Sequence, residues 1–291
     1  MMSKKLEDVV LDIYHILENN QSAEGVDVDR ICDEAGREVA EAIRNAVSPQ
    51  RDRRNLRLSA VGKPDRKIYN QYHGVDAEPL RGPTLVKFLY GHVVEAMVLA
   101  LVELAGHEVK DKQKEVEVEG VTGHIDCRID GVLVDVKSSS SYGFKKFRNN
   151  ELHKDDAFGY IGQLKAYAYA EGDTEYAWLA MDKANGTLAV LKYDETDTTS
   201  SYYDDVNWDV SERVREIKKL VGSSIVPTVC YEPVPDGKSG NMKLDTGCSY
   251  CDFKHHCWPD LQTYIYANGP RYFTLVAKEP RVQALGLPEG F

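Results

Sequence analysis

Apolar residues recur along this chain with two different periods, which change from one segment to the next. Steps of three and four residues, typical of helices with one buried face, predict helices over residues 5–19, 28–47, 84–105, 157–170 and 211–220. Alternating or short apolar runs predict strands over residues 115–119, 123–129, 132–137, 176–181 and 187–193. The order of these elements predicts an α/β fold, a mixed central β-sheet flanked by helices.

Breaks in the pattern divide the chain into three predicted parts. Residues 1–50 are expected to form an N-terminal helical extension, and residues 51–224 a core that holds the sheet. Residues 225–291 are rich in proline, glycine and cysteine, so we expect this C-terminal region to be held by a metal rather than by a large core. Its end, residues 269–291, indicates at most a docked tail.

Composition supports a folded chain. Of 291 residues, 42% are hydrophobic and 29% are charged, which excludes disorder across the whole length. The longest apolar run, near residues 97–104, is broken by Glu103 and is too short to cross a bilayer, so no membrane contact is expected. Acidic residues stand where a signal peptide needs apolar ones, which predicts a cytoplasmic protein.

The net charge of −11 argues against a protein that coats nucleic acid over its whole surface. The charge is segregated, however. Residues 51–67 hold seven basic and two acidic residues, residues 137–148 hold four basic and no acidic ones, and residues 194–212 hold seven acidic and no basic ones. Each patch alone is equally typical of a solvated face, but two basic segments leave room for a groove that binds DNA.

Two strands joined by Asp130-Gly131, a pair typical of a tight hairpin, carry the candidate chemistry. Because side chains alternate along a strand, the hairpin can bring Asp126 beside Asp135 and Lys137 on one polar face. Paired carboxylates suit a hard divalent cation such as Mg²⁺, which lowers the pKa of a bound water. An Asp-x-Lys triplet alone is equally typical of a surface ion pair.

Residues on two predicted helices favour a metal site over a surface ion pair. Glu95 interrupts the apolar helix 84–105, where a glutamate needs a partner, and a metal held by the two aspartates would supply one. Gln163 and Tyr167 lie four residues apart and hence on one helix face. Both side chains can hydrogen-bond a phosphate or a base edge, although a polar helix edge facing solvent would look the same.

Together these segments resemble the PD-(D/E)XK nuclease superfamily over roughly residues 50–260, and the nearest branch is that of the RecB-type exonucleases, with the phage exonucleases and the CRISPR adaptation nucleases. The motifs that carry the resemblance are Glu95, Gly123-His124-Ile125-Asp126, Asp135-Val136-Lys137 and Gln163-x-x-x-Tyr167. The resemblance implies a restriction-endonuclease-like core and a Mg²⁺- or Mn²⁺-dependent DNA exonuclease. Glu95, Asp126, Asp135 and the carbonyl of Val136 would bind the metal. Lys137 would be the catalytic lysine, and Gln163 and Tyr167 would position the substrate.

The resemblance also implies where the protein acts and which partners it has. The chain looks like a phage-encoded enzyme of the host cytoplasm that degrades, processes or recombines DNA, with recombination or replication proteins as partners. Basic residues expected to grip the phosphate backbone are Arg66, Lys67, Lys145, Lys146 and Arg148. A structure-specific endonuclease of the same superfamily and a catalytically silent DNA-binding module stay as alternatives. Cleavage polarity, strand preference and oligomeric state are left open.

Three of the six cysteines, Cys248, Cys251 and Cys257, fall within ten residues. In a reducing compartment such a cluster is typical of a metal site, and thiolates suit an iron–sulfur cluster or zinc. Relatives in the resembled branch carry a [4Fe–4S] cluster on one cysteine before the core and three after it. Here Pro64 stands in the segment where that early cysteine falls.

The fourth ligand must therefore come from elsewhere in this sequence. Cys230 is the expected one, because it lies just upstream in the same region. Cys32 would restore an N-terminal ligand, although its place beside a helical apolar stripe favours a core residue. His255 or His256 would instead complete a zinc site with three cysteines and one histidine.

Overall fold

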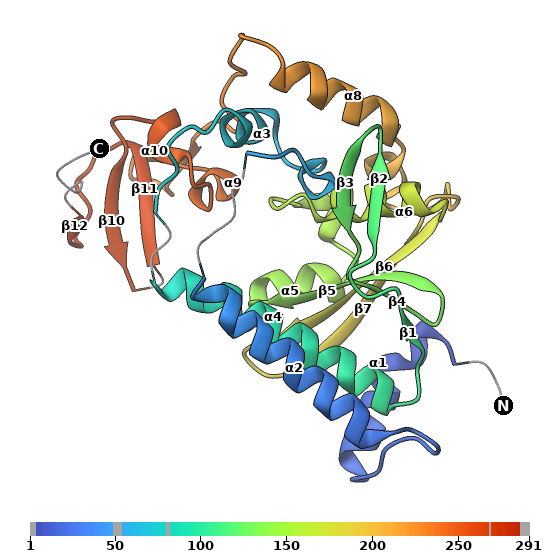
Figure 1. Ribbon diagram of the computed structural model, residues 1–291. Coiled ribbons are helices and arrows are strands. Elements are labelled where there is room, and N and C mark those ends of the chain that lie inside the picture. The colour runs from blue at the N-terminus through green and yellow to red at the C-terminus, as the bar shows by residue number, and fades with distance from the viewer. Residues whose placement is uncertain (1–3, 49–53, 80–81, 268, 286–291) are drawn as a thin grey trace. The chain divides into compact units, whose positions relative to one another are not determined.

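The computed structural model describes residues 4–48, 54–79, 82–267 and 269–285 (Figure 1). The chain forms two compact units, which we call the sheet unit and the cysteine unit. The sheet unit comprises Met1–Asp52, Leu56–Gly62 and Arg81–Arg215, and the cysteine unit comprises Arg53–Asn55, Lys63–Leu80 and Glu216–Phe291. Residues 63–80 thus group with the cysteines, although the sequence pattern places them in the core.

The sheet unit contains most of the predicted elements. Its helical segments are η1 (Leu6–Asp8), α1 (Val9–Glu18), α2 (Val28–Ala46), η2 (Leu58–Ala60), α4 (Gly82–Leu104), α5 (Ser141–Arg148), η3 (Leu152–Lys154), α6 (Tyr160–Glu171), α7 (Tyr203–Val206) and the start of α8 (Val210–Val221). Its strands are β1 (Val109–Lys110), β2 (Glu115–Val118), β3 (Val121–His124), β4 (Cys127–Ile129), β5 (Val132–Ser139), β6 (Glu175–Asp182) and β7 (Leu188–Asp194). All five predicted helices are confirmed, with bounds shifted by up to four residues.

The predicted mixed sheet is also confirmed. Five strands lie in the order β1-β4-β5-β6-β7, and β5 and β6 are parallel while the other neighbours are antiparallel. One predicted strand, over residues 123–129, is wrong as a single strand. Its first half, β3, pairs with β2 in a separate two-stranded sheet, and its second half, β4, pairs with β5. The chain leaves one sheet and enters the other at Ile125 and Asp126.

The β4–β5 hairpin has the predicted turn. Asp130 and Gly131 both have left-handed backbone angles, with φ of 50° and 87°, as a two-residue turn between twisted strands requires. The register pairs Cys127 with Val134, so the next position along β5, Asp135, lies across from Asp126. This turn therefore fixes which side chains meet at the candidate site.

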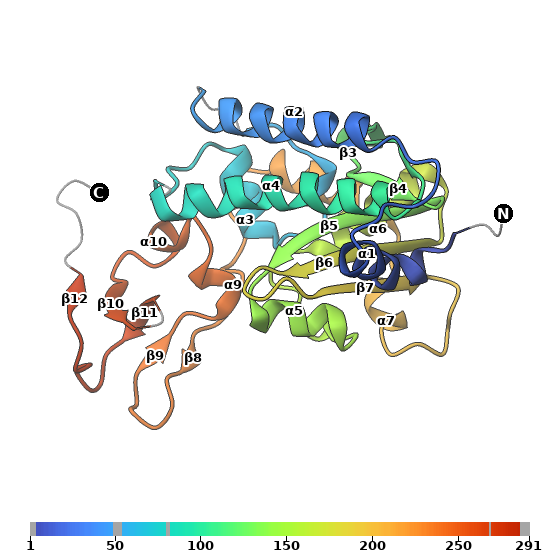
Figure 2. The same ribbon diagram turned by 90° about the horizontal axis from the view of Figure 1, so that it is seen from below.

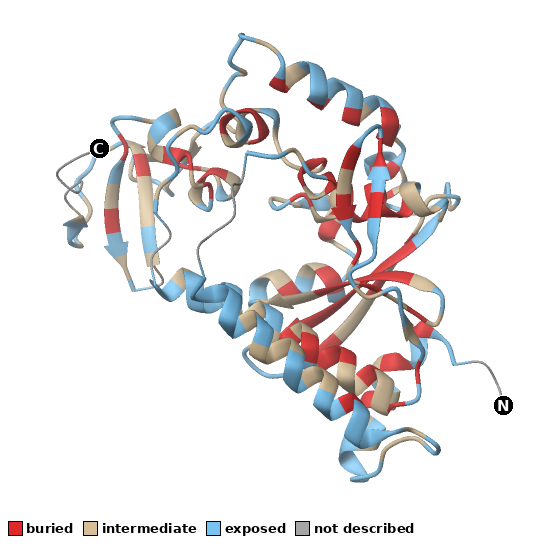
Figure 3. Ribbon diagram, viewed as in Figure 1, coloured by how far each residue is buried: buried red, intermediate tan, exposed pale blue. Residues whose placement is uncertain are grey.

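Helices cover both faces of the five-stranded sheet. Apolar residues of α1 and α4 pack with Val134, Val136 and Leu179 on one face. Figure 2 shows α4 along this face with α2 beyond it, and α5 on the opposite face. Figure 3 shows that the buried residues concentrate in the strands and in the sides of the helices that face them. The sheet is therefore a rigid platform beneath the site.

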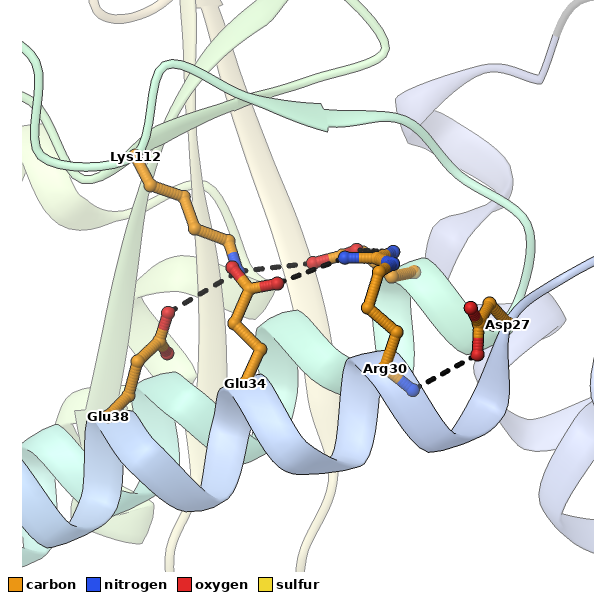
Figure 4. Close-up of polar contacts among 6 residues, drawn as sticks. Asp27, Arg30, Glu34, Glu38 and Lys112 are labelled. Atoms are coloured by element: carbon orange, nitrogen blue, oxygen red, sulfur yellow. Dashed lines mark hydrogen bonds and ion pairs between the residues drawn. The ribbon is translucent and has the colours of Figure 1, made fainter.

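Ion pairs hold α2 against α4 (Figure 4). Lys112, in the turn after β1, lies 3.2 Å from Glu34, 3.4 Å from Glu38 and 3.1 Å from Glu103. Arg30 lies 3.0 Å from both Glu34 and Glu103. Burial lowers the pKa of Lys112, but the three carboxylates outweigh it and raise that pKa. Two basic side chains, Arg30 and Lys112, thus pair with three acids from two helices. These ion pairs fix α2, although that helix buries few apolar side chains.

Among the described helices, α4 is long and apolar enough to cross a membrane, by length and composition. The apolar run near residues 97–104 is the last part of this helix, and the expected lack of membrane contact stays a prediction. The helix starts at Gly82 and runs for 23 residues, and Glu103, in its last turn, pairs with Arg30 and Lys112. In this structure the buried side of α4 packs on the sheet.

The cysteine unit is more regular than its sequence predicts. It contains α3 (Asp65–Tyr72), α9 (Thr246–Ser249), α10 (Lys254–Cys257) and five antiparallel strands in the order β12-β10-β11-β9-β8. The strands are β8 (Val234–Pro235), β9 (Met242–Lys243), β10 (Gln262–Tyr266), β11 (Gly269–Leu275) and β12 (Ala284–Leu285). The described part of the expected docked tail, residues 269–285, thus contains two strands of this sheet, β11 and β12, with Phe273 fully buried. The apolar core of the cysteine unit is small and centres on Leu244, Cys248 and Leu261.

Candidate active site and cysteine cavity

Three polar side chains converge where β4 leaves β5. Asp126 accepts a hydrogen bond at 3.1 Å from the backbone N–H of Val136, which fixes its carboxylate across the strand pair. The Lys137 ammonium lies 2.5 Å from one carboxylate oxygen of Asp135, a side chain that is 2% exposed. The structure therefore brings together Asp126, Asp135 and Lys137, as the hairpin predicts.

Glu95 reaches the same place from α4. Burial raises the pKa of its carboxyl, and the charges of Asp135 and Glu38 raise it further, while that of Lys137 lowers it. Glu95 lies in the middle of this apolar helix, and 24% of its side chain is exposed. His92, one turn earlier, is exposed and lies 4.0 Å from Glu95.

The charges in this cluster do not balance. Burial raises the pKa of Asp126, and burial together with the Asp126 charge raises the pKa of Asp135 to about 7, although Lys137 opposes both shifts. The two aspartates raise the pKa of Lys137 well above its ordinary value, although burial opposes this shift. One ammonium thus faces three carboxylates. An additional cation would lower the energy of the site.

The donor set fits a hard divalent cation. Among the described residues, Lys137 and Asp126 are the polar neighbours of the Asp135 carboxylate, and its two buried oxygens keep lone pairs for a further partner. Carboxylate oxygens are the ligands that Mg²⁺ and Mn²⁺ take. Among the described residues, no group of three or more histidine, cysteine or acidic side chains is already gathered at metal-binding distance.

Helix α6 places the predicted pair, Gln163 and Tyr167, beside these acids. Tyr167 is 3% exposed, and Gln163, one turn earlier, hydrogen-bonds its hydroxyl. Burial and the charges of Asp135 and Asp126 raise the pKa of Tyr167 to about 12, so the phenol is neutral and can donate. The ring lies on Gly123, where an added Cβ would come within 2.6 Å of it. Gln163 and Tyr167 thus belong to the site rather than to a solvated helix edge.

The start of α6 is fixed by features that the motifs do not reveal. Asp156 accepts the N–H groups of Tyr160 at 2.9 Å and Ile161 at 2.8 Å, which caps the helix. The backbone at Gly62 crosses α6 so closely that a Cβ on Gly162 would lie 2.4 Å from the Cα of Gly62. This contact between backbones sets the position of α6, and with it that of Gln163 and Tyr167.

We expect a Gly162→Ala substitution to destabilise the protein by about 1–3 kcal/mol and to reduce its activity, because the clash is with backbone and α6 must move. The matched control is Gly36→Ala in α2, where an added Cβ meets nothing within 4 Å. Alanine should stabilise that helix by about 0.5–1 kcal/mol. Thermal unfolding of both variants measures the difference, and equal stability of the two would contradict the packing argument.

One further residue joins the site without having been predicted. The ring of Tyr160 lies with its centroid 5.2 Å from the Lys137 ammonium, a cation–π distance. Burial raises the pKa of Tyr160, so this phenol too is neutral. The only sequence signal was its position three residues before Gln163, on the same helix face.

The predicted DNA-binding residues fall in two places. Lys145, Lys146 and Arg148 lie on α5 in the sheet unit, where Lys145 and Arg148 are exposed and Lys146 pairs with Asp155 at 2.6 Å. Arg66 and Lys67 lie on α3 in the cysteine unit, where both line a cavity together with the cysteines. Their role in DNA binding stays a prediction.

That cavity brings together all four expected cysteine ligands. Cys230, Cys248, Cys251 and Cys257 line it, and its lining residues include no histidine. Cys32 is exposed on α2 in the sheet unit, and neither His255 nor His256 is among the lining residues. The alternatives for the fourth ligand are therefore not supported by the placement of these side chains.

Hydrogen-bond donors point at the cysteine sulfurs. Backbone N–H groups donate hydrogen bonds to three of the sulfurs: that of Lys67 to Cys230, that of Tyr231 to Cys248 and that of Phe253 to Cys251. The Asn70 amide approaches the sulfur of Cys257 at 3.9 Å. Burial nevertheless raises the pKa of three of the thiols, to about 12 for Cys248, and neighbouring cysteines raise it further. Donors aimed at sulfurs are typical of thiolates that bind a metal centre.

No family model and no curated protein sequence matches this chain. Several solved structures are similar at 13–16% identity. SSO0001 has a TM-score of 0.42 and 13% identity, covering 76% of this chain and 95% of that one. An alkaline exonuclease, LHK-Exo from Laribacter hongkongensis, has a TM-score of 0.38 and 13% identity, covering 59% and 91%. A phage-related exonuclease from Haemophilus somnus 129PT has a TM-score of 0.36 and 16% identity, covering 57% and 93%.

LHK-Exo has also been solved in complex with dAMP. The chain thus bears a distant structural resemblance to phage-related and alkaline exonucleases. Similarity at these scores does not assign an activity, because function depends on the residues of the site and not on the fold.

Proposed function

We propose that this protein is a Mg²⁺- or Mn²⁺-dependent deoxyribonuclease that degrades linear DNA from an end. The observation that carries the proposal is the cluster of Glu95, Asp126 and Asp135 around a single ammonium, that of Lys137. Three acids that share one ammonium leave two carboxylates without a counter-ion, and a divalent cation would balance them; shifted pKa values of this kind are typical of functional sites. The motif resemblance adds the reaction class, hydrolysis of a phosphodiester bond.

Each residue has a distinct role in this proposal. Glu95, Asp126, Asp135 and the carbonyl of Val136 would hold the cation, which supplies Lewis acidity and an acidified water. Lys137 stays protonated, because two aspartates raise its pKa. It would therefore act as a fixed positive charge beside the attacked phosphate and not as a general base.

The remaining site residues would hold the substrate. The neutral Tyr167 hydroxyl and the Gln163 amide can donate to a phosphate oxygen, and Lys145 and Arg148 on α5 offer charge to the next phosphates. Such an enzyme would act in the cytoplasm of a phage-infected cell, beside proteins of recombination or replication.

For the cysteine cavity we propose a [4Fe–4S] cluster held by Cys230, Cys248, Cys251 and Cys257, with structural zinc as the alternative. The four side chains line one cavity, and thiolates suit an iron–sulfur cluster or zinc, of which the motif resemblance favours the cluster. The centre would stabilise a unit whose apolar core is small.

End-labelled linear DNA and covalently closed circular DNA, incubated with Mg²⁺, Mn²⁺ or EDTA, test the activity. We expect metal-dependent loss of the linear DNA only, abolished by Lys137→Ala. The control is Lys192→Ala, which removes a lysine of β7 that pairs with Glu7 and Glu175. This variant should keep full activity.

Other outcomes assign the alternatives. Cleavage of closed circles that Lys137→Ala abolishes would replace the exonuclease by a structure-specific endonuclease. If the folded protein cuts neither DNA but retards both in a gel, a catalytically silent DNA-binding module becomes the better account. Cleavage that survives in EDTA would contradict the metal-dependent site itself.

A further inference from the structure

Helix α3 presents one face to the cysteine cavity. Lys67 and Asn70 lie three residues apart on this helix, and both line the cavity. The backbone N–H of Lys67 donates to the sulfur of Cys230, and the side-chain amide of Asn70 donates to the sulfur of Cys257 at 3.9 Å. One helix face thus contacts two of the four proposed ligands.

The Asn70 side chain is buried for the sake of this contact alone. It is 1% exposed, and among the described residues its amide makes one hydrogen bond, that to Cys257, while its buried Oδ1 accepts none. A leucine of similar size would fill the same space without the cost of a half-satisfied amide. Turning the amide over would set the acceptor Oδ1 against the sulfur, so the orientation with the donor at the sulfur is the favourable one. A buried amide that bonds a single sulfur indicates a role toward that sulfur.

The strength of this hydrogen bond depends on the charge of the sulfur. A neutral thiol is a weak acceptor, whereas the thiolate of a metal centre carries negative charge and accepts a charge-assisted bond. The charge around the cavity favours thiolates, because its described lining residues include Arg66, Lys67 and Lys254 and no acidic side chain. The Asn70 amide therefore fits metal-bound thiolates better than free thiols.

We propose that Asn70 is a positioning residue that acts on the [4Fe–4S] cluster through Cys257, raising its one-electron reduction potential and slowing its loss to oxidants. A hydrogen bond from the amide is strongest when the sulfur carries most negative charge, so it stabilises the reduced form of the cluster more than the oxidised one. Hydrogen bonds to the sulfurs, net charge and solvent exposure set the potentials of such clusters. This inference rests on the proposed cluster, since structural zinc has no potential to tune.

Redox titration of the full-length protein, purified without oxygen, tests this role, with electron paramagnetic resonance of the reduced cluster as the readout. Asn70→Leu keeps the side-chain volume and removes the donor. Its midpoint potential should fall, so that at a fixed potential the ratio of reduced to oxidised cluster drops about three- to tenfold. Air should also bleach its visible absorbance several times faster than that of the unsubstituted protein.

Asn241→Leu is the matched control. Asn241 is 3% exposed in the same cysteine unit, but it does not line the cavity, and its amide bonds the backbone of Lys278 at 2.9 Å and 2.8 Å instead of a sulfur. This variant should unfold at a lower temperature and leave the potential unchanged. An equal fall of the potential in both variants would show a general disturbance of the unit and overturn the specific role of Asn70.

A second measurement needs no substitution and decides the matter if Asn70→Leu fails to hold the cluster. In protein that carries nitrogen-15 in its asparagine side-chain amides, electron–nuclear double resonance of the reduced cluster should show a coupling to that nitrogen, because Asn70 is the one asparagine among the described lining residues. Absence of this coupling, or an unchanged potential in Asn70→Leu, would overturn the role of Asn70 and leave the cluster. Zinc or no metal in the purified protein would overturn the cluster itself and this inference with it.

Discussion

An Asp135→Asn protein is expected to lose DNA cleavage by about a hundred- to a thousandfold and, without metal, to be more stable than the unsubstituted protein at neutral pH. The loss of activity follows from removing a carboxylate that the cation needs. The gain in stability has a separate cause, the cost of burying this charge. Burial and the Asp126 charge raise the pKa of Asp135 to about 7, so its ionisation is unfavourable in the folded state.

The sign of the pH dependence follows from this shift. The pKa of Asp135 rises from an ordinary value of 3.8 to about 7 on folding, so between these two values the folded state binds the proton that the unfolded state releases. The stability of the metal-free protein therefore falls as pH rises through this interval. The asparagine variant avoids the penalty, and its gain should reach about 2–4 kcal/mol above pH ~7 and vanish near pH ~4.

Asp182→Asn is the matched control, because Asp182 is equally buried at the end of the neighbouring strand β6. Its carboxylate accepts hydrogen bonds from Ser141, the backbone of Ala184 and Asn185, at 3.0–3.1 Å. An amide would face some of these donors with its own, so this variant should lose about 1–3 kcal/mol.

Metal-free thermal unfolding over a pH series measures both effects, and added Mg²⁺ should stabilise the unsubstituted protein but not Asp135→Asn. Destabilisation by both substitutions at every pH would refute the claim that Asp135 carries a desolvation cost. Full cleavage by Asp135→Asn would refute its role as a metal ligand.

A Cys230→Ser protein, prepared without oxygen, is expected to lose the iron, the inorganic sulfide and the visible absorbance that we predict for the intact protein. It should also unfold at a lower temperature, because the cysteine unit has only a small apolar core to replace the centre. Cys32→Ser serves as the control, since that side chain is exposed on α2 and its loss should change neither property. Metal analysis and thermal unfolding provide the two measurements.

The same measurements distinguish the alternatives. Zinc in place of iron, lost again in Cys230→Ser, would keep the four ligands and change the metal. Loss of the centre in Cys32→Ser but not in Cys230→Ser would show that the ligand set is wrong. A protein that holds neither metal and unfolds normally in both variants would leave the cavity a set of free thiols.

The sequence was most informative where chemistry and periodicity coincide. The Asp130-Gly131 turn fixes the register of β4 and β5, so the meeting of Asp126 and Asp135 could be predicted from alternation alone. Glu95 was detectable because a charge in an apolar helix is rare. For the same reason Gln163 and Tyr167 were placed on one face of a helix that does exist.

Other features depend on contacts that no local pattern encodes. The break at Ile125 arises because β3 and β4 pair with partners in different sheets. In the cysteine unit, strands as short as two residues have no period to detect, and three of its five strands are that short. The crossing of Gly62 and Gly162 joins residues a hundred positions apart, and the role of Tyr160 depends on where that crossing places α6.

The origin of the three carboxylates in different parts of the chain has a consequence for folding order. Asp126 and Asp135 belong to one hairpin, and such hairpins form within about 1–10 μs. Glu95 joins them only when α4 packs on the sheet, so this packing step removes water from like charges. Repulsion among the carboxylates therefore opposes the packing of α4 when no cation is bound, and a cation removes this cost. Metal binding should thus favour the folded state as well as the chemistry.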